Sequence, residues 1–557
     1  MIKNYYMQRM LSPLLSLLNR ISIFHALLSV TIAYAFLVSC AEVREQPTEP
    51  ILTSFEIEKS LNKQIKNNIK FEKVGDSNVF LASYLSWVDS DMPDSFIPSF
   101  TFEGEKVTIN GLEVISGESS ISFAEDVICS VYNKGEKRDY VLSFICPQIN
   151  TGLPVLRIDL DDKDIKDEYQ YLEAKMLLYD PATKDTWWDY DSDKVSIRGR
   201  GNSTWVLPKK PYRIKFPKKI SPLGESTIEA KNWALLAHDM DKSLIRNHLG
   251  FTIARKLTEI DGSSSFVPCS HFINVYFDNE YHGLYQLTDH IERDKGRVDI
   301  EKLDVKTGDS PDVISGGYML ETVINIDDPA IHFTTPHGYG IDHKYPKDDD
   351  HLDSQYKYIE DYVAEAESCL YSDAFDDPTY GWRKYFDEKS LVDYVIIKEL
   401  AGDMDGYVST RLYKKRGDDR LYFGPVWDMD KGWGNDNRTP FPEFPPSSSL
   451  MIHGGFRMNA ANTTDWFCRF WEDDSFRSAV ITRWNQVKAL LMDEVLREID
   501  NCEKGMSKSI LANYEVWPFN YQASEFASTP ANDYSGELDK MRQMTRDRAN
   551  LLDELFK

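Results

Sequence analysis

The sequence predicts an α+β chain in which a small all-β module precedes a larger mixed domain and a helical C-terminal region. Short alternating apolar segments dominate before residue 150, strands mix with helices from 153 to 440, and helical patterns follow. At 557 residues the chain is too long for one compact core, and its content of 42% hydrophobic and 13% aromatic residues suffices for two or three folded domains.

The N-terminus is typical of an exported lipoprotein. Residues 21–39 carry no Asp, Glu, Lys or Arg, and basic residues precede them. The run ends in LVSC, which is similar to a bacterial lipobox, where a peptidase cleaves before a cysteine that is then acylated. We therefore expect a signal peptide over 1–39, lipidation at Cys40 and a tether over 40–51. The alternative is a membrane anchor helix with an incidental cysteine.

This N-terminus predicts a location in the cell envelope, with the chain attached to a membrane through Cys40. No aspartate follows the anchor directly, since Ala41 and Glu42 come next. By analogy with known sorting rules, this favours the outer membrane.

The net charge argues against a nucleic-acid partner, and the cysteine spacing argues against a structural zinc site. With 90 acidic against 64 basic residues the formal net charge is -26, which repels a phosphate backbone, so we expect no nucleic-acid partner. The six cysteines after Cys40 are scattered and contain no C-x-x-C pair, so a structural zinc site has no support. Their spacing does not assign any disulfide.

Residues 52–149 predict a β-sandwich of the immunoglobulin-like type. Short segments with alternating apolar and polar residues lie between turn signals, as in SFTFEGEKVTINGLEVI. Such modules commonly act as spacers, so we expect no chemistry here. A break at residues 150–154 separates this module from the next unit.

Strands and helices mix between residues 153 and 440. The predicted elements are strands at 194–198 and 212–216, a helix at 242–258 with Asp241 as its N-cap, a hairpin at 272–287, and strands at 410–414 and 421–426.

Residues 441–557 predict a helical region. Amphipathic patterns cover 474–502 and 536–557, and Trp466, Trp471 and Trp484 are candidates for its core.

The first candidate for chemistry is RGRGNSTW (198–205), followed by the strand YRIKF (212–216). Gly199 and Gly201 permit close approach of the backbone to an anion between two strands. Alternation along the strand separates Lys215 from the apolar face, so Lys215 could reach a ligand of this loop. The alternative is a solvated lysine on an exposed sheet face.

The second candidate is a pair of acidic loops, GDMDG (402–406) and GPVWDMD (424–430), on either side of one predicted hairpin. A helix-loop-hairpin-loop arrangement brings both loops to the same end of the two strands. One carboxylate can then orient an acceptor hydroxyl while another holds a metal ion on nucleotide phosphates. The alternative is that Asp-x-Asp caps a helix or binds calcium.

From about residue 153 to 500 these features resemble the CotH family, spore-coat proteins with an atypical kinase fold. The resemblance is carried by RGRGNSTW with YRIKF, WALLAHDMDKSLIRNHLG, VYFDNEYHGLYQLTDHI, and GDMDGYVSTRLYKK followed by LYFGPVWDMDKGWGN. It implies a kinase-like domain over 153–440, with 441–557 as its helical C-terminal part.

The resemblance also implies ATP with Mg or Mn, and phosphorylation of a hydroxyl on a secreted or envelope protein. By position, Asp405 corresponds to the catalytic-loop aspartate, Asp428 to the metal-binding aspartate and Lys215 to the nucleotide-binding lysine. Asp430 would be a second metal contributor, and Gly199 with Gly201 would form the nucleotide loop.

Two departures from the family pattern keep other functions open. Spore-coat members tend to carry an asparagine about five residues after the catalytic-loop aspartate, where this chain has Ser409 and Thr410. The predicted helix at 242–258 also offers no inward-facing glutamate to pair with Lys215. The alternative is a catalytically silent surface protein that keeps the fold for binding or assembly.

A third possibility is a carbohydrate-active enzyme with paired carboxylates. It would require Trp427 and Trp433 to line an open groove beside the aspartates.

The kinase interpretation makes geometric predictions. Lys215, Asp405 and Asp428 should share one cleft under the glycine loop, with the carboxylates within a few ångströms of a common point. Asp403 should face outward or cap the preceding helix. Like charge should raise the pKa of Asp428 or of a neighbour.

Overall fold

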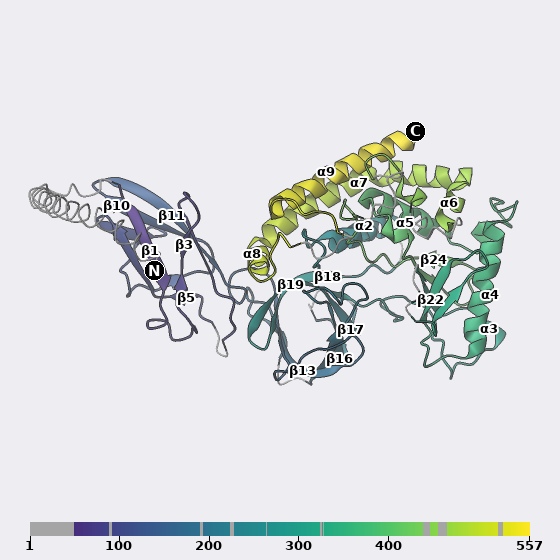
Figure 1. Ribbon diagram of the computed structural model, residues 1–557, viewed down its shortest axis with the longest axis horizontal. Coiled ribbons are helices and arrows are strands. Elements are labelled where there is room, and N and C mark those ends of the chain that lie inside the picture. Colours follow the sequence, from purple (N-terminus) through teal and green to yellow (C-terminus); the bar gives the residue numbers. More distant parts are fainter. Residues whose placement is uncertain are drawn as a thin grey trace, which may run out of the picture.

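The computed structural model describes residues 49–557 except 89–91, 190–192, 223–227, 263–264, 324–325, 327, 438–445, 455–464 and 522–526. The predicted signal peptide, Cys40 and most of the tether lie outside the described residues. No helix within the described part is long and apolar enough to cross a membrane. Figure 1 shows an N-terminal β module at one end, then a strand-rich unit, a second sheet flanked by helices, and long C-terminal helices above both. The predicted α+β class is confirmed.

The N-terminal module consists of short strands in which buried and exposed residues alternate. One sheet has the order β2-β1-β6, a second has the order β3-β4-β11-β10-β7-β8, and β5 pairs with β9. The hydrophobic core draws only on residues from Leu52 to Ile149. The strands are β1 (Ile51–Ile57), β2 (Ile69–Lys70), β3 (Glu72–Lys73), β4 (Val79–Ser83), β5 (Ser95–Phe96), β6 (Pro98–Glu103), β7 (Lys106–Ile109), β8 (Leu112–Glu113), β9 (Ile121–Ser122), β10 (Val127–Asn133) and β11 (Glu136–Ile145).

Trp87 is one of the residues through which the module contacts the rest of the chain. Its ring packs edge-on against Tyr179 and Tyr276, at centroid distances of 5.8 Å and 5.5 Å. Its backbone N–H donates to the carbonyl of Asn279 at 2.7 Å. Aromatic packing thus joins the module to the next unit.

The second unit is a closed β-barrel. Its eight-stranded sheet has the order β12-β18-β19-β17-β16-β15-β13-β14, and an additional pairing of β12 with β13 closes it. Alternate residues fill the interior, so the barrel has its own core. The strands are β12 (Val155–Asp159), β13 (Leu172–Tyr179), β14 (Thr186–Trp188), β15 (Val195–Gly199), β16 (Tyr212–Ile220), β17 (Ala230–Leu236), β18 (Ser270–Phe277) and β19 (Glu280–Asp289).

Helix α2 (Arg246–Asp261) leaves the barrel between β17 and β18. It begins four residues later than predicted because the preceding residues form a turn with Leu244 at φ 64°. The predicted capping residue still acts there: the carboxylate of Asp241 accepts hydrogen bonds from the backbone N–H groups of Ser243 and Arg246, each at 2.9 Å. Asp241 therefore satisfies N–H groups at the helix start across a longer turn.

A five-stranded sheet with the order β21-β22-β20-β23-β24 lies beside the barrel, with α4 on its outer side (Figure 1). Helix α5 packs against the last strand of this sheet. The elements are α3 (Pro311–Ile314), β20 (Tyr318–Val323), β21 (His332–Thr334), β22 (Gly340–Tyr345), α4 (Asp353–Leu370), η1 (Trp382–Lys384), α5 (Glu388–Ala401), η2 (Asp405–Tyr407), β23 (Arg411–Lys414) and β24 (Leu421–Phe423).

The C-terminal helices cover α2 and α5. Helix α7 packs against α2, α5 and α9, and α8 lies on β19 of the barrel. Trp466 and Trp484 are fully buried as predicted, whereas Trp471 is only half-buried. The elements are η3 (Met451–His453), α6 (Trp466–Trp471), α7 (Asp474–Gly505), α8 (Ser507–Val516) and α9 (Tyr534–Leu555).

Candidate functional site

One cavity of about 690 Å³ lies between the barrel, the start of α2 and the five-stranded sheet. The loop between β15 and β16 supplies part of its wall, and so do the residues that follow β17 and β19. The two predicted acidic loops complete it with Asp405, Asp428 and Asp430. The three predicted acidic residues therefore share one cavity.

The cavity is far less acidic than the chain as a whole. The chain carries a net charge of -26. Eight basic and seven acidic residues line the cavity, so its charges nearly balance. The basic residues are Arg200, Lys209, Arg213, Arg293, Lys344, Lys347, Arg411 and Lys431, and the acidic ones are Asp239, Glu292, Glu321, Asp342, Asp405, Asp428 and Asp430.

The first acidic loop is built on a buried ion pair at the end of α5. The Nζ atom of Lys398 lies 2.7 Å from Oδ2 of Asp403, and both side chains are fully buried. A Cβ atom on Gly406 would overlap the Lys398 side chain, so only glycine lets the loop pass over this lysine. The prediction that Asp403 faces outward or caps the helix is wrong, because its carboxylate pairs with Lys398 inside the protein.

This loop presents Asp405 and Ser409 to the cavity. The backbone N–H of Ser409 donates to the carbonyl of Asp405 at 3.0 Å, which fixes the turn between them. Thr410 instead is buried, and its hydroxyl donates to the carbonyl of Gly406 at 2.8 Å. Of the two hydroxyl residues in place of the family's asparagine, Ser409 is therefore the one available to a ligand.

The second acidic loop is held by α2. The side-chain oxygen of Asn247 accepts a hydrogen bond from the backbone N–H of Met429 at 2.9 Å. A Cβ atom on Gly250 would overlap Cγ of Met429, so the helix and the loop are in close contact. Met429 lies between Asp428 and Asp430, and these contacts fix where both carboxylates enter the cavity.

Pairing of β23 with β24 places the two acidic loops at the same end of one hairpin, as predicted. Leu412 lies opposite Phe423, and Lys414 lies opposite Leu421. Asp405 precedes the first strand and Asp428 follows the second, so both loops leave from the end at Leu412 and Phe423.

The carboxyl groups of the second loop have raised pKa values. Enclosure by the cavity walls raises the pKa of Asp428 even though its side chain is open to cavity water, and Arg411 and Arg200 oppose this effect. Enclosure, followed by the charge of Asp428, raises the pKa of Asp430 to about 7. The predicted direction is confirmed, but burial rather than like charge is the main cause.

The glycine loop contributes one of its two glycines to the cavity. Gly201, at φ 95°, lines the cavity. Gly199 does not line it: a Cβ atom there would lie 2.6 Å from the ring of Trp205, so this glycine serves aromatic packing. Arg200, between the two glycines, lines the cavity, and its guanidinium carbon lies 5.6 Å from the ring centroid of Trp427.

Lys215 does not line the cavity, so the prediction that it shares the cleft with the aspartates as a nucleotide-binding lysine is corrected. The side chain is exposed, and its ammonium group lies 5.8 Å from the ring centroid of Tyr171. Arg213 lines the cavity instead. The two residues share a strand face, as alternation predicts, but only the one nearer the loop reaches the site because each two-residue step moves about 6.6 Å along the strand.

An ion-paired glutamate of the cavity lies on β20 rather than on α2. Glu321 pairs with Lys344 on β22 at 2.9 Å and with Arg411 on β23 at 3.0 Å. Sequence reasoning missed all three residues. The available signals were a single carboxylate in the mostly apolar strand YMLETV and the arginine directly after Ser409 and Thr410.

Neither tryptophan expected for a carbohydrate groove lines the cavity. Trp427 is nearly buried and stacks on Phe251 at a centroid distance of 5.6 Å. Trp433 is fully buried, and its indole N–H donates to Oγ1 of Thr545 at 3.0 Å. The observation that would have favoured a carbohydrate-active enzyme is therefore absent among the described residues.

A separate cluster of potential metal ligands lies between α2 and α7. His248, Glu498 and Cys502 offer ligand atoms within 4.8 Å of one another. His248 Nε2 already lies 2.8 Å from Oε1 of Glu498, and burial raises the pKa of the Cys502 thiol, which disfavours the thiolate that binds metal. This cluster therefore stabilises helix packing.

The cavity aspartates are not brought as close together as that cluster. Asp405, Asp428 and Asp430 line one cavity, but among the described residues their carboxylates form no group with all ligand atoms within 4.8 Å. The expectation that Asp405 and Asp428 converge within a few ångströms of a common point concerns two carboxylates and stays a prediction.

The family model described as CotH kinase protein matches residues 197–552. The matched range begins in β15, ends in α9 and includes the three cavity aspartates, while the N-terminal β module lies outside it. No curated protein matches the chain.

Proposed function

Because the chain belongs to the CotH kinase protein family, we propose that it is a CotH-type protein kinase, which transfers the γ-phosphoryl group of ATP to a hydroxyl of a secreted or surface protein. The observation that carries this proposal is the shared position of Asp405, Asp428 and Asp430 in one cavity with a glycine loop. A barrel and a second sheet on opposite sides of that cavity support a kinase-like fold.

In this proposal the two acidic loops have different roles. Asp405 orients the acceptor hydroxyl and accepts its proton, while Asp428 and Asp430 hold magnesium or manganese. The donor set fits such an ion, since both metals prefer carboxylate oxygens and a cation offsets the enclosure and the charge of Asp428 that raise the pKa of Asp430. When bound, the ion neutralises charge on the nucleotide phosphates.

Two arginines beside Asp428 are suited to the phosphate oxygens. Arg200 comes from the glycine loop and Arg411 from β23, and both exert attractive charge effects on Asp428. A guanidinium group can bind phosphate in a bidentate manner, so an arginine next to Gly201 can serve where other kinases use a lysine.

The test is phosphate transfer by the mature chain with labelled ATP and either metal. Asp405→Asn should lower self-labelling, or labelling of a co-exported protein, by about 100-fold or more because the acceptor loses its proton acceptor. The matched control is Asp373→Asn, an exposed aspartate that follows α4 and does not line the cavity, which should label normally. Equal labelling by Asp405→Asn and the unmodified protein would refute the catalytic role.

A second candidate function is a catalytically silent surface protein that uses the fold for binding or assembly. Two observations favour it: Lys215 lies outside the cavity, and Ser409 stands where the family has a metal-binding asparagine. This candidate predicts that ATP with magnesium or manganese causes no rise in melting temperature, since only a ligand that binds the native state stabilises it.

The proposal includes a location at the cell envelope, with a lipid anchor at Cys40 and a protein substrate on the same side of the membrane. Acylation needs the thiol, so Cys40→Ser should move the protein from the membrane fraction to the soluble one or leave an uncleaved precursor. Normal cleavage with unchanged membrane partition would exclude the anchor.

A further inference from the structure

Three basic residues of the cavity, Arg213, Arg293 and Lys347, form a group that we call the basic subsite. Among the described residues, none of them has a carboxylate within 4.0 Å, in contrast to Lys344 and Arg411, which both pair with Glu321. The Nε atom of Arg213 is buried and has no hydrogen-bond partner. The guanidinium carbon of Arg293 lies 5.8 Å from the ring centroid of Tyr345, and Lys347 is exposed. A buried donor without a partner is costly, so Arg213, with these two cations beside it, is suited to an anion supplied from outside the chain.

Neighbouring charges do not neutralise the subsite. Glu292 is the carboxylate whose charge acts most on Arg213 and on Lys347. However, one of its oxygens pairs with Arg297 at 2.6 Å, and the other accepts a hydrogen bond from Asn232 at 2.8 Å. The pKa of His290 lies well below its ordinary range because of burial and then the charge of Arg213. Enclosure by the cavity walls, and then Arg213, also lower the pKa of Lys347 although its side chain reaches solvent, while Glu292 and Asp348 partly offset this. Positive charge therefore remains in excess here.

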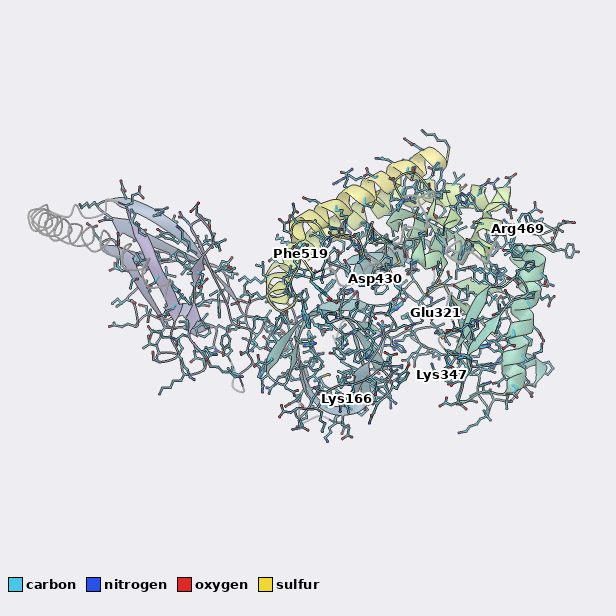
Figure 2. All side chains as sticks on the ribbon, viewed as in Figure 1. Lys166, Glu321, Lys347, Asp430, Arg469 and Phe519 are labelled. Atoms are coloured by element: carbon cyan, nitrogen blue, oxygen red, sulfur yellow. The ribbon has the colours of Figure 1, made fainter. Side chains whose placement is uncertain are left out.

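The basic subsite is separate from the acidic loops. The charges that act most on Asp428 are those of Arg411, Arg200, Glu321 and Asp405, and none of them belongs to the subsite. Figure 2 shows Asp430 above and to the left of Glu321, and Lys347 below Glu321. Lys347 is exposed, so this end of the cavity opens to solvent.

We infer that the basic subsite binds anionic groups of the acceptor protein, carboxylate or phosphate, close to the hydroxyl that is phosphorylated. This inference rests on the proposed kinase function. The nucleotide phosphates have Arg200, Arg411 and the metal-binding aspartates, whereas the subsite lies at the open end through which a protein segment enters. Since the chain is strongly acidic overall, an acidic segment gains attraction only where such a subsite offsets the net charge.

The test compares peptides of equal length that carry one serine flanked by glutamate, glutamine, lysine or phosphoserine. The mature chain should phosphorylate the glutamate peptide with a kcat/KM at least about tenfold above that of the glutamine peptide, with the lysine peptide poorest. The double variant Arg293→Gln/Lys347→Gln should reduce this preference to near unity. Lys166→Gln, which removes an exposed cation outside the cavity, should keep it. The phosphoserine peptide shows which anion is preferred.

Two further readouts separate this inference from the proposed function. The rise in melting temperature with ATP and metal should be the same in the double variant, and peptide affinity measured by fluorescence anisotropy should show the same order without catalysis. If the double variant loses the nucleotide effect and keeps the peptide preference, the subsite binds nucleotide and the inference is overturned.

If nothing is phosphorylated but glutamate peptides still bind best, the kinase proposal fails and the subsite remains. Equal affinity for all peptides overturns the inference.

Discussion

Two walls of the cavity are held by different interactions. The acidic wall consists of the loops that carry Asp405, Asp428 and Asp430, and the strand wall consists of the loop between β15 and β16 with the adjoining part of β16. Around the acidic loops, cations and carboxylates are paired in the interior. Arg246, fully buried, pairs with Asp241 and, at 2.8 Å, with Glu537, and its Nε–H donates to the carbonyl of Gly432 at 3.0 Å. Lys398 pairs with Asp403 in the same way. The backbone that carries the aspartates is therefore tied to three helices.

The strand wall relies on aromatic packing and leaves cations unpaired. Trp205 packs edge-on against Tyr212 at 6.3 Å, and the ammonium group of Lys210 donates to the carbonyl of Trp205 at 2.6 Å. Val206, at the tip of this loop, is 78% exposed. Arg200 and Arg213 have no carboxylate within 4.0 Å among the described residues, so this wall depends on a ligand where the acidic wall depends on the fold.

The largest effect is expected at the buried ion pair of the acidic wall. Lys398→Met leaves Asp403 buried without its cation, which should lower the free energy of unfolding by about 3–5 kcal/mol. Urea denaturation measures this change. The matched control is Lys357→Met, which removes one partner of the exposed pair with Asp361 on α4 and should barely move the midpoint. Similar losses of unfolding free energy in both variants would mean that the buried ion pair of the acidic wall is worth no more than an exposed pair.

A smaller effect is expected where α2 meets the second acidic loop. Gly250→Ala forces Met429 to shift, which should cost about 1–3 kcal/mol in unfolding free energy and displace Asp428 and Asp430. Because the two aspartates move, the rise in melting temperature that nucleotide causes should become smaller in this variant. Gly505→Ala is the control, because nothing lies within 4 Å of a Cβ atom there, and it should be neutral or slightly stabilising. An unchanged nucleotide effect in Gly250→Ala would show that the loop position is not critical.

In the strand wall, Lys209 should make the free energy of unfolding depend on pH. Burial lowers the pKa of this lysine to about 7, from 10.5 in an exposed lysine. Between these values the unfolded chain binds one more proton than the folded chain, so the contribution of Lys209 to stability rises with pH from about 7 to 10.5 and is constant below that window. The unfolding free energy of Lys209→Met should rise less with pH across this range than that of the unmodified protein. Parallel pH profiles would contradict the lowered pKa.

The sequence predicted the acidic wall better than the strand wall, for a physical reason. The order helix, loop, hairpin, loop requires Asp405 and Asp428 to leave from one end of the hairpin, whatever the surrounding side chains do. The position of Lys215 depends on how far along β16 the cavity extends, which alternation does not determine. The roles of Asp403 and Glu321 depend on partners 5 or more residues away in other elements, Lys398 on α5 and Arg411 on β23, which become neighbours only after folding.

The smallest effect is expected at Lys215 itself. Its side chain is exposed and lies outside the cavity, with the ring of Tyr171 as its neighbour. Lys215→Met should therefore change the unfolding free energy by no more than about 0.5 kcal/mol and leave the nucleotide-induced rise in melting temperature unchanged. Arg200→Met, on the same wall but inside the cavity, should reduce that rise, because it removes a cation beside Asp428. If Lys215→Met abolished nucleotide binding while Arg200→Met did not, the strand wall would have to move toward the aspartates when a nucleotide binds, and the contrast between a fixed acidic wall and a ligand-dependent strand wall would become a difference in mobility.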